Sequence, residues 1–475
     1  MTALSSAPAA VGRARGSHDH HRRRRDHQRL PQRQLRPGGR EVTVTDLDVV
    51  GAIPAQLDGR YVRTGPNPIA PDPSNHHWFA GEGMVHGVRL RDGKAEWYRN
   101  RYVRSPQVTG ALGEPAVPSD EGGLVPGLGN TNIVHHAGRL LALMELSLPF
   151  ELTPDLDTVR ATNLGGPLPA GINAHPKFDP DTNELHVMAY SFAEPILRYH
   201  VIGTDGLLRR TEELALGAPV MVHDMALTDS SVIAFDLPVV FSLELAMAGR
   251  SMPFVWDPDY TPRRGSCPQR LGCRHDVDRA RRALLRVPPL NAYDDDGRVV
   301  IDLVVHPKAF ANTEREPSQG EPSMQRWVLD PAAGTCSRTV IDERGQEFPH
   351  ADERLAGRRH RYGYSVAVPE LAGLGGGVGG PGGTLLGYDL GAGTVTEHHF
   401  GAGCTPSEFV FVPAAPDAAE NEGWLMGYVH DGATDTSSLQ ILDATDVAAP
   451  PVARVELGHR VPQGFHGNWM PEGGA

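Results

Sequence analysis

From Glu41 onward the chain alternates short apolar or β-branched runs with clusters of Gly, Pro and Asp. Runs of about four to eight residues bounded by such turn-forming residues are typical of β-strands. The segment FAGEGMVHGVRLRDGKAEWYRNRYVRS predicts two strands that turn at Asp92-Gly93, and HPKFDPDTNELHVMAYSF predicts two that turn at Asp181 to Asn183. LLGYDLGAGTVTEHHF and DATDVAAPPVARVEL repeat the pattern. Because no long amphipathic helix interrupts these segments, the sequence predicts an all-β fold.

Residues 1–40 differ from the rest of the chain. They are rich in Arg, His and Gln and show neither strand alternation nor helical periodicity. By composition they form a disordered or aberrant tail. The stretch HDHHRRRRDH within them has the composition of a metal-binding or nucleic-acid arm, but a solvated tail is the simpler interpretation.

Composition narrows the classes of protein that remain. Of the 475 residues 40% are hydrophobic, and 54 Gly with 41 Pro provide many turns around the core that this permits. The net charge of −13 argues against a nucleic-acid partner, because phosphate binding requires a basic surface. Four cysteines without paired spacing predict a reducing compartment. Without an apolar signal core or a run of about 18 apolar residues, we expect a cytoplasmic protein, with peripheral membrane contact left open.

Three histidines stand in similar local settings far apart in the chain. His175 lies in GINAHPKFDPDTNE, His223 in MVHDMALT and His466 in VPQGFHGNWM. Each lies beside an apolar run and next to a turn-forming residue or a carboxylate. Imidazoles this distant in sequence meet only in a closed fold, so the pattern suits a metal held on the axis of a ring-like β architecture.

Further phrases extend over most of the chain after residue 41. In chain order they are GRYVRTGPNP, HWFAGEGMVHGV, NRYVRS, NTNIVHHAGRLLALMEL, NAHPKFDPDTNEL, VHDMALT, NAYDDDGRVV, EFPHADERLAGRRHRYGYS, SEFVFVP and PQGFHGNW. Together they resemble the carotenoid cleavage oxygenases, a family that includes apocarotenoid and lignostilbene oxygenases. The resemblance implies that residues 41–475 form a single domain, a seven-bladed β-propeller with Fe(II) on its axis. In that family four histidines bind the iron, and glutamates orient three of them.

The resemblance assigns roles to particular residues. His175, His223 and His466 match three of the iron ligands, and Glu145, Glu347 and Glu408 match the orienting glutamates. A carboxylate that accepts the outer ring N–H of a histidine fixes its tautomer and orientation. No catalytic residue beyond the metal ligands is implied.

The remaining ligand position departs from the family. In the family the corresponding segment resembles VFHPLNAY, whereas this chain has RVPPLNAY. Pro288 therefore occupies the position of a histidine ligand. His306 in LVVHPKAF comes eighteen residues later, and it would reach the axis only after a change of strand register. Three imidazoles with open positions can still hold Fe(II) or Zn(II), though more weakly.

A frameshift is one hypothesis for this departure. Codons for Arg286 to Pro289 permit Val-Phe-His when read one base later, and residues 264–289 lack the alternating pattern of a strand. The same shift applied to RQLRPG, Arg33 to Gly38, permits another family phrase. We therefore hypothesise paired compensating frameshifts in the gene or its recorded sequence, which resequencing would test.

The resemblance implies an Fe(II)-dependent dioxygenase that splits a carbon–carbon double bond of an apolar conjugated substrate with O₂ to give two carbonyl products. The lignostilbene branch resembles GKANTN, with a lysine near the place that Leu128 takes in GLGNTN here. The absence of this lysine favours an apocarotenoid over a stilbene as substrate. One alternative is a degenerate, inactive propeller that binds an apolar ligand, since Pro288 removes one imidazole. Another is a propeller hydrolase using Ca²⁺ or Zn²⁺, which would need more carboxylate or amide oxygens for calcium.

Adjacent histidines are expected to be ordinary polar or core residues. His135-His136 and His398-His399 lie in predicted strands, where neighbouring side chains point to opposite faces, so one metal rarely binds both. His86 is expected to be structural or to line a substrate channel. The same expectation holds for His350.

Overall fold

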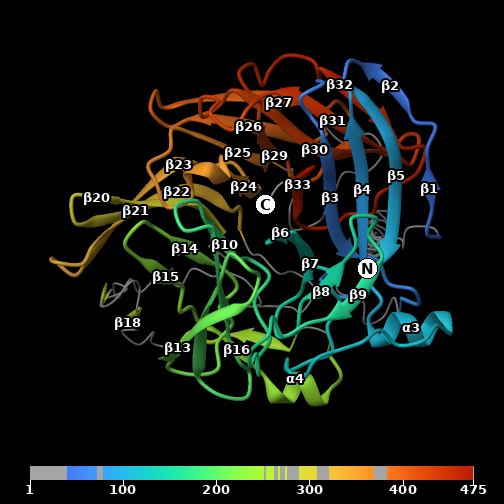
Figure 1. Cartoon of the computed structure of the whole chain (residues 1–475). Coiled ribbons are helices and arrows are strands. Elements are labelled where there is room, and N and C mark those ends of the chain that lie inside the picture. The colour runs from blue at the N-terminus through green and yellow to red at the C-terminus, as the bar shows by residue number, and fades with distance from the viewer. Residues whose placement is uncertain are drawn as a thin grey trace, which may run out of the picture.

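A computed structural model describes residues 40–71, 79–250, 253–260, 266–267, 273–274, 288–307, 320–367 and 382–473. Its sheets are arranged around a central region, with two short helices at one edge (Figure 1). The helices of the described residues are α3 (Pro106–Leu112), α4 (Leu243–Met247) and the 3₁₀ helix η1 (Glu353–Leu355). The fold is therefore all-β, as the sequence predicts.

Six sheets have four or more strands. The first sheet has the order β1 (Thr43–Val44), β5 (Lys94–Tyr102), β4 (Gly83–Arg91), β3 (Gly59–Pro66), β33 (Gly467–Pro471). The next two are β6 (Asn132–His136), β7 (Arg139–Leu143), β8 (Phe150–Leu152), β9 (Thr158–Ala161), and β10 (Lys177–Asp179), β11 (Glu184–Ala189), β12 (Ile196–Ile202), β13 (Leu208–Ala215). Two more are β20 (Pro289–Asp295), β21 (Arg298–Val305), β22 (Ser323–Asp330), β23 (Thr335–Asp342), and β24 (Gln346–His350), β25 (Tyr362–Ala367), β26 (Thr384–Asp389), β27 (Thr394–His399). The last sheet has the order β2 (Asp48–Gly51), β32 (Ala453–Glu456), β31 (Thr436–Asp443), β30 (Gly423–Asp431), β28 (Cys404–Pro406), with β29 (Val410–Pro413) also paired to β30.

The region between β13 and β20 is built differently. It forms the two-stranded pairs β14 (Met225–Leu227) with β15 (Val232–Ala234), β16 (Val239–Phe241) with β17 (Phe254–Trp256), and β18 (Ser266–Cys267) with β19 (Cys273–Arg274). The described part of the chain thus forms a β-propeller with six blades, and the predicted number of seven is wrong. Strands of two or three residues are too short to complete a four-stranded sheet here, and most of residues 264–289, where we hypothesise a frameshift, lie outside the described residues.

Apolar side chains of neighbouring sheets pack face to face around the ring. One core joins the first sheet, the β6–β9 sheet and the β10–β13 sheet. A second core joins the β20–β23 sheet to the β24–β27 sheet, and a third joins the β24–β27 sheet to the sheet that contains β28 to β32. The two-stranded pairs β14–β15 and β16–β17 pack on β10–β13, and β14–β15 also packs on β20–β23. A core between the last and the first sheet closes the ring, as do the pairings of β33 with β3 and of β2 with β32.

Edge strands of successive sheets contact one another at the centre. These contacts join β33 to β6, β10 to β14, β14 to β20, β20 to β24 and β29 to β33. We call these seven strands the inner strands. A residue placed just before an inner strand therefore lies near the centre of the ring, and this arrangement brings distant parts of the chain together.

The predicted turns are confirmed. β4 and β5 join through Asp92 and Gly93, both in the left-handed region with φ of 49° and 70°. β10 and β11 join through residues that include Asn183, whose φ is 55°. Asp, Asn and Gly adopt this conformation at low cost, so local chemistry fixes these hairpins. Of the predicted tail, residues 1–39 lie outside the described residues, and the single-domain boundary at 41 stays a prediction.

Candidate metal centre

His175 is held just before the inner strand β10. Gly171 has a φ of 67°, and a Cβ there would collide with the backbone of Ser147, which only glycine avoids. The Asn173 N–H donates to the Met188 carbonyl at 2.7 Å, and Asn132 Nδ2 donates to the carbonyl of residue 174 at 2.8 Å. These bonds fix the loop that carries His175, which is buried.

His223 and His466 occupy equivalent positions. His223 lies two residues before the inner strand β14, and His466 lies directly before β33. The N–H of His466 donates to the Thr131 carbonyl, and the carbonyl of His466 accepts from the Thr64 N–H, each at 3.2 Å. The backbone N–H and carbonyl of His466 are thus both hydrogen-bonded to segments of the N-terminal part of the chain.

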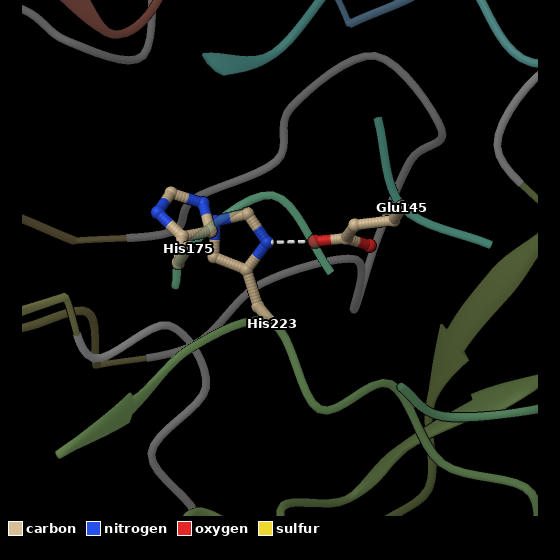
Figure 2. A group of neighbouring side chains, drawn as sticks. All are labelled: Glu145, His175 and His223. Atoms are coloured by element: carbon tan, nitrogen blue, oxygen red, sulfur yellow. Dashed lines mark hydrogen bonds and ion pairs between the residues drawn. The ribbon is translucent and has the colours of Figure 1, made fainter. Parts of the chain in front are cut away.

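The three imidazoles converge, as the sequence predicts. Ring centroids of His175 and His223 are 4.3 Å apart, and those of His175 and His466 are 4.7 Å apart. One possible ligand atom from each of Glu145, His175 and His223 lies within 4.8 Å of the others, and Figure 2 shows these side chains together. We call His175, His223 and His466 the imidazole cluster. Its role in metal binding stays a prediction.

Two carboxylates accept hydrogen bonds from the cluster. Glu145 Oε1 accepts a hydrogen bond from His223 Nδ1, drawn as the dashed line in Figure 2. Glu408 Oε1 accepts from His466 Nδ1 at 3.0 Å, and its Oε2 accepts from the Gly467 N–H at 2.8 Å. With hydrogen on Nδ1, the lone pair of each ring lies on Nε2.

The charge state of Glu408 follows from its partners. Burial raises the pKa of this carboxyl, but its interaction with His466, together with the Gly467 N–H and the neighbouring His350, outweighs burial, so the pKa lies below its usual value. Tyr190, whose hydroxyl donates to Glu145 Oε2 at 2.5 Å, has a pKa raised well above normal by burial and then by the Glu145 charge. Tyr190 therefore remains a donor.

The residues present fit a metal cation. The Nε2 atoms of His223 and His466 are buried and have no hydrogen-bond partner among the described residues. A buried imidazole nitrogen with its lone pair available and its other nitrogen bonded to a carboxylate is the usual donor for a divalent transition metal. Iron and zinc both accept such a donor set.

Glu347 lies elsewhere. Its Oε1 is 2.5 Å from Nε2 of His306, and both side chains are almost fully buried. The resemblance implies that Glu347 orients a metal ligand, whereas the structure places it against a histidine outside the imidazole cluster. Pro288 lies directly before the inner strand β20, as His466 does before β33, whereas His175 and His223 lie two residues before β10 and β14.

The sequence reasoning missed three residues near the cluster. Asp224 Oδ2 lies 3.8 Å from His175 Nδ1, and Lys177 Nζ lies 2.9 Å from Asp224 Oδ1. Tyr190 is the third, through its bond to Glu145. Asp224 and Lys177 lie one and two residues from predicted ligands, so their proximity in the sequence was the available signal. Tyr190 gave no such signal, because it depends on the packing of β11 beside Glu145.

A cavity of about 370 Å³ adjoins the cluster. Its lining includes His175 and His466, and also Pro288, Glu347 and His350. Apolar side chains supply much of the wall: Val134, Phe178, Leu185, Leu227, Leu290, Phe348 and Trp469. The size is that of a typical small-molecule site.

The other histidines fall into two groups. His135 and His136 both line the cavity, although the strand pattern predicts opposite faces. His136 Nε2 bonds the Gly203 carbonyl at 2.8 Å, which agrees with a polar core residue. His86 is buried and its Nδ1 bonds the Tyr98 hydroxyl at 2.9 Å, so it is structural.

The fold and the site together define a closed β-propeller with carboxylate-supported imidazoles at its centre. The chain matches the family described as retinal pigment epithelial membrane protein over residues 35–471. The carotenoid cleavage oxygenase of Mycobacterium tuberculosis is 41% identical over 492 aligned positions, covering 92% of this chain and 96% of that protein. The chain therefore belongs to the retinal pigment epithelial membrane protein family, and it is a dioxygenase like its named relatives.

Solved structures agree with this assignment. Pseudomonas brassicacearum lignostilbene dioxygenase is 26% identical with a TM-score of 0.79, covering 92% of this chain and 96% of that one. A cobalt-substituted Synechocystis apocarotenoid oxygenase is 25% identical with a TM-score of 0.79, covering 93% and 99%. Among the described residues, every helix is too short or too polar to serve as a membrane span.

Proposed function

We propose that the chain is an Fe(II)-dependent dioxygenase that cleaves a C=C bond of a carotenoid or apocarotenoid with O₂, giving two carbonyl products. One observation carries the proposal: the rings of His175, His223 and His466 meet at one place beside a cavity with apolar walls. The carotenoid cleavage oxygenase of M. tuberculosis and the cobalt-substituted apocarotenoid oxygenase support the substrate class and a metal.

The protein groups orient and tune the site. Glu145 and Glu408 hold the hydrogen of their partner rings on Nδ1, so that His223 and His466 present Nε2 as neutral donors. Neutral donors leave a bound cation its full positive charge. Fe(II), when bound, supplies the electron density that O₂ chemistry requires.

The cavity would hold the substrate. Phe178, Leu290 and Trp469 offer apolar and aromatic surface to a conjugated chain, and positioning one double bond near the cluster is the main contribution such walls make to rate. Leu128, in place of a lysine, favours an apocarotenoid over a phenolic stilbene. Because the chain is also similar to a lignostilbene dioxygenase, a stilbene is included as a second test substrate.

A lipid-soluble substrate would arrive from a membrane surface. Leu112 on α3 and Leu243 and Met247 on α4 are exposed, the last by 81%, and both helices lie at the same edge of the molecule (Figure 1). We propose peripheral membrane contact at this edge. A cytoplasmic location stays a prediction.

A second candidate function is a degenerate propeller that binds an apolar ligand without turnover. Pro288 favours it, because proline has no side-chain donor for a metal at a position where three other inner strands carry histidine. Iron analysis with oxygen uptake separates the two functions.

The test uses the full chain loaded with Fe(II) without oxygen. Oxygen uptake is measured with an apocarotenal, with a hydroxystilbene and without substrate. We expect one iron per chain, uptake with the apocarotenal and two carbonyl products by mass spectrometry. Ligand binding without iron or uptake would instead support the degenerate propeller.

A further inference from the structure

Four inner strands are each preceded, one or two residues earlier, by a residue near the centre of the ring. His175 and His223 stand two residues before β10 and β14, and His466 stands one residue before β33. Pro288 stands one residue before β20 and lines the same cavity as His175 and His466. Three of these four positions therefore offer an imidazole, and the fourth offers a side chain that cannot bind a metal.

His306 lies one strand farther from the centre than Pro288. It directly follows β21, which pairs with β20, and the Val304 N–H donates to the Pro288 carbonyl at 3.0 Å. Pro288 and Glu347 line the cavity, and His306 contacts Glu347. His306 therefore approaches from the second strand of its blade.

The His306 ring contacts its carboxylate through the other ring nitrogen. In His223 and His466 the carboxylate contacts Nδ1, which leaves Nε2 at the far end of the ring for the cluster. In His306 the carboxylate of Glu347 contacts Nε2 at 2.5 Å. The other nitrogen, Nδ1, is next to the ring carbon that joins Cβ, so it reaches less far from the backbone than Nε2 does.

We infer that this chain holds its metal through three imidazoles, those of His175, His223 and His466, and that His306 is the partner of Glu347 rather than a fourth ligand. The inference rests on the proposed function. It gives Glu347 a structural role beside Pro288, and among the described residues no imidazole would replace the one that Pro288 removes.

The test measures metal binding directly. Metal-free protein is titrated with Co(II) by calorimetry, and X-ray absorption counts the imidazole ligands of the loaded wild type. We expect three imidazoles in the wild type. We expect the Kd of His306→Gln for Co(II) to stay within about threefold of the wild-type Kd. His175→Ala should bind Co(II) more weakly by more than about 100-fold, and Pro288→His should bind it more tightly by about 10-fold or more.

Each other outcome has a definite meaning. Four imidazoles in the wild type, or a His306→Gln variant that unfolds at the wild-type temperature but binds as weakly as His175→Ala, overturns the inference. If Pro288→His alone binds metal, the site of the proposed function stands and three imidazoles are insufficient. If no variant binds metal, the proposed function itself is wrong.

Discussion

The two sides of the central cavity are built from the same parts but differ in what faces the centre. On the imidazole side, Glu145 and Glu408 lie behind His223 and His466. On the Pro288 side, Glu347 lines the cavity and its histidine, His306, lies on the next strand. The carboxylates thus contact different ring nitrogens on the two sides: Nδ1 of His223 and His466, but Nε2 of His306.

A polar network secures the Pro288 side. Asp302 is buried on β21 and accepts two hydrogen bonds of 2.7 Å from Arg326, and its Oδ2 lies 3.1 Å from His360 Nε2. Burial raises the pKa of Asp302, but the bonds from Arg326 and His360 outweigh it, so the pKa is lowered. This side is held for stability, and the predictions below separate that role from metal binding.

The largest expected effect is on the Pro288 side. Asp302→Asn should lower the free energy of unfolding of the metal-free protein by about 3 kcal/mol, because it leaves the Arg326 charge without its buried partner. Denaturation with urea measures the change. The control Asp295→Asn affects surface pairs with Arg298 and Arg359 and should cost less than about 1 kcal/mol. Equal losses would show that the network is not special.

The next effect is on the imidazole side. His223→Ala should weaken Co(II) binding by more than about 100-fold, because it removes a ligand rather than an outer partner. His350→Ala, which alters a histidine that lines the cavity beside the imidazole cluster, should change the Kd by less than about threefold. Calorimetry measures both. A similar loss in both variants would contradict the asymmetry of the cavity.

Exchange of the glutamates should give a smaller difference. Glu145→Gln should weaken Co(II) binding by about 10- to 100-fold, because an amide accepts the Nδ1 hydrogen less strongly than a carboxylate. Glu347→Gln should stay within about threefold. Glu151→Gln, which breaks a pair with Arg139 away from the cluster, is the control. If Glu347→Gln has the larger effect, the Pro288 side takes part in metal binding.

The smallest effect is a pH dependence on the imidazole side. Burial, followed by the charge of Arg198, lowers the pKa of His200 from 6.5 to about 4. The unfolded chain therefore binds a proton that the folded chain excludes, so stability is full above pH 6.5 and falls as the pH drops toward 4. Between pH 8 and 6 the loss should be about 1 kcal/mol.

The substitution His200→Asn should reduce the loss between pH 8 and 6 by this amount, measured by urea denaturation at each pH, while buried His86, whose pKa burial also lowers, keeps its own contribution. His399→Asn changes an exposed histidine and should keep the wild-type slope. An unchanged slope in His200→Asn would show that the dependence arises elsewhere.

The sequence alone determined the strands, the tight turns and the candidate ligands. Asp92-Gly93 and Asn183 set their turns through local backbone preferences, and His175, His223 and His466 were found because each stands in a recognisable phrase. These are properties of a few neighbouring residues. The number of blades was not predictable in this way, since the short strands between β13 and β20 depend on what packs against them.

Tertiary structure decided which carboxylate contacts each histidine and through which ring nitrogen. Glu347 reads like Glu145 and Glu408 in the sequence, yet it meets His306, because Pro288 stands before β20 and β21 brings His306 alongside. Asp224, Lys177 and Tyr190 join the site through the same closure of the ring. Such contacts join segments more than 40 residues apart, so no local pattern specifies them.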